Sequence, residues 1–353
     1  MKIAQVAPLH ESVPPKLYGG TERIVAFLCD ALVDLGHDVT LFACGDARSS
    51  AKLVATRERA LRLDPEPVHW ELPAHLLQLA EVQKRADEFD LIHFHTDPLY
   101  FPVFEERSRS TLTTLHGRQD YKDLALLYRH WPDYPLVCIS RSQSAPITFA
   151  RDLSIVPHGL PPDLFCPPRE PRGDYLGFIG RMSPEKRPDR AIEIAERAGI
   201  PLRMAAKIDP KEEVYFRREV QPLLQAAHVD YVGEIGEAQK SDFLGHARAL
   251  LFPIDWPEPF GLAMVEAMAC GTPVIAWNCG SVPEIIDHGE TGFIVDSIEA
   301  AVEAVQRIGE LDRARVRRRF EERFSARTMA RNYVAIYERL LASAARSPLA
   351  ATR

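Results

Sequence analysis

Short apolar stretches rich in Val, Ile and Leu alternate along the chain with longer amphipathic segments. Such alternation is typical of parallel strands that are buried on both faces and joined by covering helices. In the first half, strands are predicted at 2–8, 38–45, 90–95, 110–116, 135–140 and 153–159. A second series is predicted at 175–180, 201–207, 229–235, 249–254, 272–277 and 292–296. Each half is therefore expected to form an open α/β unit of about the size of one domain.

The two series are separated by a proline-rich segment, residues 157–174, with the sequence PHGLPPDLFCPPREPRGD. Proline and glycine at this density resist both helix and sheet, so this segment is the best candidate for a linker. We therefore predict a first domain over 1–166 and a second over 167–325. An amphipathic segment over 326–345 follows the second domain and is expected to form a helix.

Composition excludes several classes of protein. The chain has 353 residues, of which 46% are hydrophobic, and a formal net charge of −7. Its basic residues are dispersed among the acidic ones, which argues against nucleic acid as a partner. The six cysteines form no CxxC pair, so we expect reduced thiols and a cytoplasmic protein. The first residues lack the long apolar region of a signal peptide, and no run is long enough to cross a bilayer, so any association with a membrane is expected to be peripheral.

The loop after the first predicted strand contains YGGTER, residues 18–23. Gly19 and Gly20 remove side chains where the backbone turns into a helix, which is predicted to start near Thr21 as its N-cap. The N-terminus of such a helix exposes N–H groups and a partial positive charge, which suit a phosphate. A purely structural turn is the alternative, and the absence of GxGxxG counts against a dinucleotide site.

Two cations follow the first strand of the second series, in GRMSPEK at residues 180–186. Open α/β sheets bind ligands at the carboxyl ends of their strands, so Arg181 and Lys186 would suit a diphosphate there. The alternative is a solvated turn before a helix, because Pro184 and Glu185 are favourable at a helix start.

Three histidines lie at strand ends of the first domain: His93 and His95 in LIHFHTD, and His116 in TTLHGRQD. A metal site is not expected, because no cysteine or carboxylate accompanies them at ligand spacing and His93 alternates with His95 as strand residues do. Gly117 leaves space beside His116. His116 is therefore the histidine that we consider for a functional role.

The segment EPFGLAMVEAMACG, residues 258–271, combines a loop with a short helix. Pro257 and Pro259 restrain the backbone around Glu258, and Glu266 falls about one turn inside the helix. Both carboxylates could accept hydrogen bonds from one polyhydroxylated ligand. A solvent-exposed position for Glu266 is the alternative, although its apolar neighbours argue for a buried carboxylate with a partner.

With YGGTER, GRMSPEK, EPFGLAMVEAMACGTPVIA and GSVPEIIDHGETGFIV, the chain resembles the family 4 retaining glycosyltransferases of the GT-B fold, a superfamily that includes glycogen synthase and mannosyltransferases. The resemblance covers nearly the whole chain. It implies an α/β architecture of two facing Rossmann-like domains with the active site in the cleft between them. A nucleotide-sugar donor would bind mainly to the second domain and the acceptor to the first, to which the helix over 326–345 would return.

The resemblance also implies roles for the two glutamates and for the loop between them. Glu258 would contact hydroxyls of the transferred sugar, with help from the backbone amides of Phe260, Gly261 and Leu262. Glu266 would hold the ribose hydroxyls of the nucleotide. The two acids would thus divide one donor between them.

The cations, the paired glycines and the histidine complete the implied site. Arg181 and Lys186 would neutralise the diphosphate, and Gly19 and Gly20 would let the first loop approach it. His116 would lie near the sugar and the acceptor. Because fixed cations and helix N–H groups can stabilise the departing diphosphate, no metal ion or other cofactor is expected.

The implied reaction is a same-face, oxocarbenium-like transfer with retention, from a UDP- or GDP-sugar to an acceptor hydroxyl. The acceptor is expected to be a carbohydrate, a lipid or a small molecule, and Arg118 and Asp120 are candidates on its side of the site. Two alternatives stay open: a glycoside phosphorylase that uses inorganic phosphate on the same scaffold, and a non-enzymatic two-domain sugar-binding protein.

Overall fold

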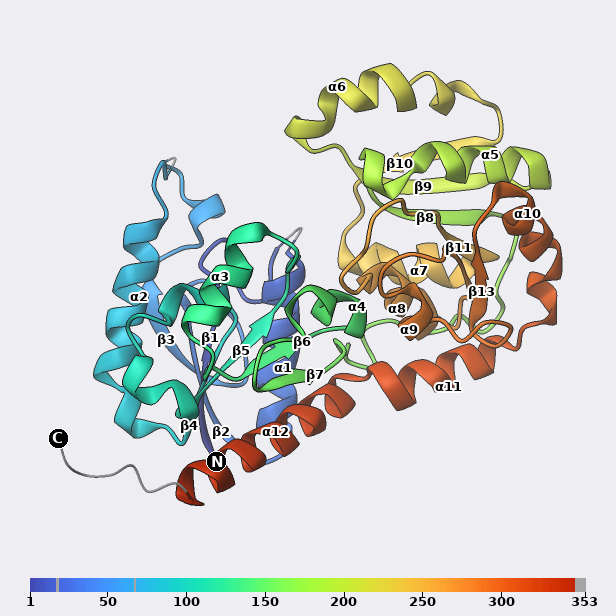
Figure 1. The fold of residues 1–353 in the computed structure, drawn as a ribbon. Helices are drawn as coiled ribbons and strands as arrows, with labels where there is room; N and C mark the ends of the chain where they lie inside the picture. Colours follow the sequence, from blue (N-terminus) through green and yellow to red (C-terminus); the bar gives the residue numbers. More distant parts are fainter. Residues whose placement is uncertain (17–18, 67, 347–353) are drawn as a thin grey trace. The chain divides into compact units, whose positions relative to one another are not determined.

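The computed structural model describes residues 1–16, 19–66 and 68–346, and it divides into two compact units (Figure 1). Unit 1 comprises Met1–Gly159 together with the chain from Ala326 onward, and unit 2 comprises Leu160–Ser325. The chain thus leaves unit 1 inside the proline-rich segment and returns to it after Ser325. Two α/β units with parallel sheets confirm the predicted fold class. No helix within the described residues is long and apolar enough to cross a membrane.

Unit 1 is built on a parallel sheet whose strands, within the described residues, follow the order β3-β2-β1-β4-β5-β6-β7. These strands are β1 (Lys2–Val6), β2 (Asp38–Cys44), β3 (Lys52–Arg57), β4 (Leu91–Phe94), β5 (Thr111–Leu115), β6 (Leu136–Cys138) and β7 (Leu153–Ile155). The helices are α1 (Gly20–Asp34), α2 (Leu72–Lys84), α3 (Lys122–His130), α4 (Arg141–Ser144) and α12 (Ala326–Arg346). Helices α1 and α12 pack side by side, and α2 lies against β3.

The edge strand β3 is absent from the predicted set. Its residues are exposed or half-buried, and its sequence KLVATR carries charges at both ends. A strand that has only one neighbour needs no continuous apolar run, so the pattern that finds buried strands misses it. By contrast, every residue of β4 and β5 is buried, which explains the clear signal of these two strands.

Helix α1 begins slightly earlier than predicted. Gly19, not Thr21, is its N-cap, and the Gly19 carbonyl accepts a hydrogen bond from the Arg23 amide at 3.4 Å. No side chain caps this helix. The expectation of a threonine cap was wrong because the chain already turns at the two glycines, which places Thr21 inside the first turn.

Unit 2 repeats the design with the strand order β10-β9-β8-β11-β12-β13 among the described residues. The strands are β8 (Leu176–Arg181), β9 (Leu202–Lys207), β10 (Val229–Gly233), β11 (Ala249–Phe252), β12 (Val274–Trp277) and β13 (Gly292–Val295). The helices are α5 (Pro188–Ala198), α6 (Glu213–Tyr215), α7 (Glu237–His246), α8 (Leu262–Ala269), α9 (Val282–Ile285), α10 (Ile298–Arg307) and α11 (Arg313–Phe324). Helix α5 packs against α10, and α8 packs against both α7 and α11.

Both sheets have a Rossmann-like order, in which the strand sequence reverses direction at the first strand. In unit 2 this point lies between β8 and β11, which pair in parallel. Ligands of open α/β sheets bind beyond the carboxyl ends of the strands at such a switch point. The segments that follow β8 and β11 are the ones that carry the predicted donor residues.

Candidate active site

The predicted donor residues of unit 2 gather at the carboxyl ends of two neighbouring strands. Arg181 is the last residue of β8, and Lys186 ends the short 3₁₀ turn Pro184–Lys186 that follows it. Glu258 lies in the loop after β11, and Glu266 lies in α8. The sheet therefore brings side chains from separate parts of the sequence to one edge.

Lys186 and Glu258 pair directly. The Lys186 ammonium donates to Oε2 of Glu258, and the Trp256 indole N–H donates to the same oxygen at 3.0 Å. The Lys186 Nζ also lies 5.2 Å from the Trp256 ring centroid and 5.5 Å from that of Phe252. The Lys186 and Glu258 side chains are only 15% and 13% exposed. Each of these charges is thus compensated by the other.

Glu258 is positioned by a glycine that the sequence analysis did not single out. Gly280 has φ +59°, and a Cβ there would lie 2.4 Å from the Glu258 nitrogen and 2.6 Å from its carbonyl oxygen. The next residue, Ser281, donates its backbone N–H to the Glu258 carbonyl at 3.0 Å. Only glycine permits this close approach and this backbone conformation together. The loop that carries Glu258 therefore rests on the turn after β12.

Glu266 is buried, with 2% of its surface exposed, and the alternative of a solvated helix face is excluded. Its two carboxylate oxygens accept hydrogen bonds from the Lys240 ammonium at 2.7 and 2.9 Å. Lys240 belongs to α7 and was not among the predicted residues. Lys240 reaches Glu266 because α7 packs against α8, and no local sequence pattern predicts this packing.

Arg181 has one partnered and one unpartnered donor. Its Nη2 donates to Glu185 at 2.8 Å, while its Nε is buried and has no hydrogen-bond partner among the residues that the structure describes. A buried N–H without an acceptor is costly, so this group is suited to an anionic ligand. The predicted helix start at Pro184 is a 3₁₀ turn, and α5 begins after Arg187, which has φ +51°.

The loop between the two glutamates ends in the N-terminus of α8. Gly261 is the N-cap of α8 with φ +84°, and Leu262 is the first helical residue. Phe260 is 3% exposed, and its carbonyl accepts a hydrogen bond from the Ser281 hydroxyl at 2.7 Å. The first N–H groups of any helix have no intrahelical partner and attract negative charge. The loop therefore leads into the N-terminus of α8, and the contact of its amides with a donor stays a prediction.

In unit 1, His116 lies at the end of β5 within a cluster of histidines. Its Nε2 is 2.9 Å from Nδ1 of His95, and its ring stacks on His158 at a centroid distance of 5.2 Å. Burial lowers the pKa of His116 to about 3 and holds those of His93, His95 and His158 well below the ordinary value. These rings are therefore neutral, and both nitrogens of His93 and of His95 hydrogen-bond to other side chains. His158 was not considered as a site residue; it falls in the strand predicted over 153–159, but β7 ends at Ile155.

The remaining predicted residues also belong to unit 1. Gly19 is buried, and a Cβ there would lie 2.9 Å from Cβ of Pro15, so close packing favours glycine at this position. Gly20 is the first residue of α1. Arg118 and Asp120 pair with each other at 2.9 and 2.6 Å on an exposed loop, and the Arg118 hydrogen bond lowers the pKa of Asp120. The cleft that would bring these residues to the donor set of unit 2 stays a prediction.

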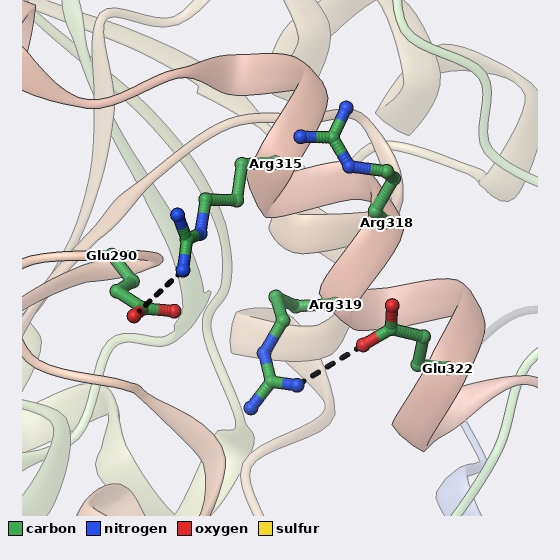
Figure 2. A pocket seen from close by; sticks show the side chains of 5 residues that line it. All are labelled: Glu290, Arg315, Arg318, Arg319 and Glu322. Carbon is green, nitrogen blue, oxygen red and sulfur yellow. Dashed lines mark hydrogen bonds and ion pairs between the residues drawn. The ribbon is translucent and has the colours of Figure 1, made fainter.

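A hollow of about 410 Å³ lies along α11, and Figure 2 shows the side chains that line it. Arg315 pairs with Glu290 at 2.9 Å, and Arg319 pairs with Glu322 at 3.0 Å. None of the predicted donor residues lines this hollow. Its cations are largely compensated by carboxylates, so it shows no preference for a ligand.

Comparisons with known proteins identify the family. Residues 18–143 match the family model described as "Glycosyltransferase Family 4", and residues 167–326 match "Glycosyl transferases group 1". The spore coat protein SA of Bacillus subtilis is 34% identical over 385 residues, which cover 96% of this chain and 100% of that protein. The D-inositol 3-phosphate glycosyltransferase of Rhodococcus erythropolis is 30% identical over 161 residues, and the matched part spans only 36% of that protein.

Solved structures show the same fold. AviGT4, a glycosyltransferase involved in avilamycin A biosynthesis, superposes with a TM-score of 0.70 at 25% identity, covering 97% of this chain and 98% of that one. The Anabaena protein HepE, solved in complex with UDP and glucose, gives a TM-score of 0.73 at 16% identity, covering 96% of this chain and 100% of that one. Fold, motifs and matched length agree: the chain belongs to the family 4 glycosyltransferases of the GT-B fold.

Proposed function

We propose that this protein transfers a sugar from a nucleoside-diphosphate sugar to an acceptor hydroxyl, with retention of configuration and without a metal ion. One observation carries the proposal. At one sheet edge of unit 2, two carboxylates are each held by a lysine, Glu258 by Lys186 and Glu266 by Lys240, beside an arginine with an unpartnered donor. Such a set matches a ligand with hydroxyls at both ends and a diphosphate in the middle.

Donor binding would exchange partners within this set. The diphosphate would take Lys186 and the free Nε of Arg181, and Glu258 would be released to accept hydrogen bonds from hydroxyls of the sugar. Glu266 keeps Lys240 and still has lone pairs for the ribose hydroxyls, because a carboxylate offers about four acceptor sites. The site would thus replace one compensated pair by contacts to the ligand, and no isolated charge would be buried.

The same groups account for the chemistry. As the glycosidic bond breaks, negative charge grows on the diphosphate, where Lys186, Arg181 and the N-terminus of α8 stabilise it. Glu258 is bound by Lys186 and by the Trp256 indole, which suits an acceptor of sugar hydroxyls better than a nucleophile. We therefore infer a same-face displacement in which the departing phosphate takes the proton of the acceptor hydroxyl.

Two similarities support the donor class. HepE, which shares the fold, binds UDP and glucose, and D-inositol 3-phosphate glycosyltransferase is by name a sugar transferase.

A panel of UDP-, GDP- and ADP-sugars provides the test. A true donor should raise the unfolding midpoint of the protein through ligand linkage. In the presence of an acceptor extract it should release the nucleoside diphosphate, in EDTA as well as in Mg²⁺, and the product should keep the anomeric configuration of the donor by NMR. The Glu258→Gln variant, which preserves the size and hydrogen bonds of the loop, should lose turnover.

Other outcomes would assign a different function. Release of a sugar 1-phosphate from disaccharides and inorganic phosphate, with no reaction of any nucleotide sugar, would identify a glycoside phosphorylase. Tight binding of a sugar without turnover of any donor would identify a binding protein. Inversion of the anomeric centre, or loss of activity in EDTA, would overturn the proposed mechanism.

A further inference from the structure

A chain of buried hydrogen bonds in unit 1 ends at His116. The Gln5 amide in β1 donates from Nε2 to the Tyr337 hydroxyl of α12 at 3.2 Å. Its Oε1 lies 2.8 Å from Nε2 of His95, and Nδ1 of His95 lies 2.9 Å from Nε2 of His116. The other ring nitrogen of His116, Nδ1, is buried and has no hydrogen-bond partner among the described residues.

The order of donors and acceptors determines where each proton sits. An amide oxygen can only accept, so Nε2 of His95 must carry a hydrogen. A neutral imidazole has one N–H, and therefore Nδ1 of His95 is an acceptor that must receive a hydrogen from Nε2 of His116. Burial keeps both rings neutral. The lone pair of His116 is thereby left on Nδ1.

The Gln5 amide that starts this chain is enclosed by protein on both sides. Tyr337 is fully buried, and its hydroxyl also lies 2.8 Å from Nδ1 of His93. Gln5 has no exposed surface, so neither end of its amide can turn to water. A reversed amide would present an N–H to His95 and would require the opposite tautomer at both histidines.

We propose that Gln5 and His95 are positioning residues that hold His116 as the Nε2–H tautomer, so that its Nδ1 accepts a hydrogen bond from a substrate hydroxyl. This inference rests on the proposed sugar transfer for its last step. An unpartnered buried acceptor is unfavourable in the free protein and is satisfied only when a donor arrives. A sugar or acceptor hydroxyl provides such a donor, whereas an incoming anion does not.

The first test needs no substrate. Two-bond ¹H–¹⁵N spectra of the ¹⁵N-histidine-labelled full chain report the tautomer of each ring, and His116→Asn assigns the signal of His116. We expect His116 of the wild-type protein to be the Nε2–H form. In Gln5→Met, which keeps the length of the side chain and removes its acceptor, the signal should move toward the Nδ1–H form. Tyr337→Phe, which frees the Gln5 amide to reverse, should move the His116 signal in the same direction. This variant replaces Gln5→Met in the test if Gln5→Met does not fold.

A matched control separates the effect of the histidine tautomer from a general effect of altered core packing. Tyr134→Phe removes another buried hydroxyl of unit 1, which donates to the Phe101 carbonyl at 2.5 Å and lies outside the hydrogen bonds that link Gln5, Tyr337, His95 and His116. It should leave the His116 signal unchanged. With UDP-glucose, or the nucleotide sugar that the donor panel selects, Gln5→Met should lower kcat at least about tenfold relative to Tyr134→Phe, because the wrong histidine tautomer removes a contact made during reaction. KM for the donor should change little.

The outcomes are separable. An Nδ1–H tautomer at His116 in the wild-type protein overturns the inference whatever the enzyme does. An unchanged tautomer in both Gln5→Met and Tyr337→Phe overturns the role of Gln5. A shifted tautomer with kcat equal to that of the control overturns the role of Nδ1 in the reaction. If no nucleotide sugar reacts with the wild-type protein, the proposed function fails, while the spectra still decide the tautomer.

Discussion

The buried histidines of unit 1 make a quantitative prediction about stability in mild acid. His93 has no exposed surface, and both of its ring nitrogens are used, by Tyr337 at 2.8 Å and by Thr114 at 2.7 Å. Burial holds the pKa of His93 well below its ordinary value of 6.5. His93 therefore takes up a proton near pH 6.5 in the unfolded chain but not in the folded protein. Stability from this group is complete above pH 6.5 and is lost as the pH falls.

The size of the loss follows from proton linkage and does not depend on the folded pKa as long as that value lies well below the range measured. For one histidine with an unfolded pKa of 6.5, the free energy of unfolding should fall by about 2 kcal/mol between pH 7.5 and pH 5.0. The perturbation that isolates this term is His93→Gln, because glutamine can bond to both partners but does not titrate. The variant should be less stable at pH 7.5 and should regain about 2 kcal/mol relative to the wild-type protein at pH 5.0.

The assay is urea unfolding of both proteins at half-unit steps of pH, followed by far-UV circular dichroism and by tryptophan fluorescence. Other titrating groups, such as Asp97, whose pKa is raised to about 6 by desolvation, act on both proteins and cancel in the difference. A difference that stays constant from pH 7.5 to pH 5.0 would refute the reasoning, because it would mean that His93 also takes up a proton in the folded state.

Three further predictions concern unit 2. Glu258→Gln should lower kcat at least about tenfold, because it loses a charge-assisted bond to the sugar, and should also lower the unfolding midpoint, because the Lys186 ammonium loses its counter-charge. Steady-state kinetics and thermal melts check this, and undiminished turnover would reject the role of Glu258. Lys240→Met should destabilise unit 2 by about 3 kcal/mol at neutral pH, because it leaves the Glu266 carboxylate buried without its cation. Urea unfolding measures this change. A decrease in the free energy of unfolding below about 1 kcal/mol would mean that the pair is solvated. Gly280→Ala should raise KM or lower kcat, because the added Cβ displaces the Glu258 backbone. Gly289→Ala is the control: it has a similar φ of +79° and nothing within 4 Å of its Cβ, so it should affect stability alone. Equal kinetics in the two alanine variants would contradict the proposed contact.

Much of this molecule follows from local sequence. Apolar runs predict the strands of both sheets because central strands are buried on both faces, and proline and glycine predict the linker because they resist regular structure. The edge strand β3 escaped this reasoning, since a half-exposed strand has no such run. The sequence also predicted where the four proposed donor residues lie, in or just after β8, after β11 and inside α8, while their role stays a prediction.

The partners of these side chains were decided by tertiary structure. Lys240 meets Glu266 only because α7 packs against α8, and Gly280 supports Glu258 only because the turn after β12 lies under the loop after β11. The chain from Gln5 through His95 to His116 joins three strands, and Tyr337 adds a helix from the other end of the sequence. Periodicity and propensity act over a few residues, so a sequence indicates which groups carry chemistry. Which group faces which, and therefore where a proton rests, depends on contacts that only the folded chain makes.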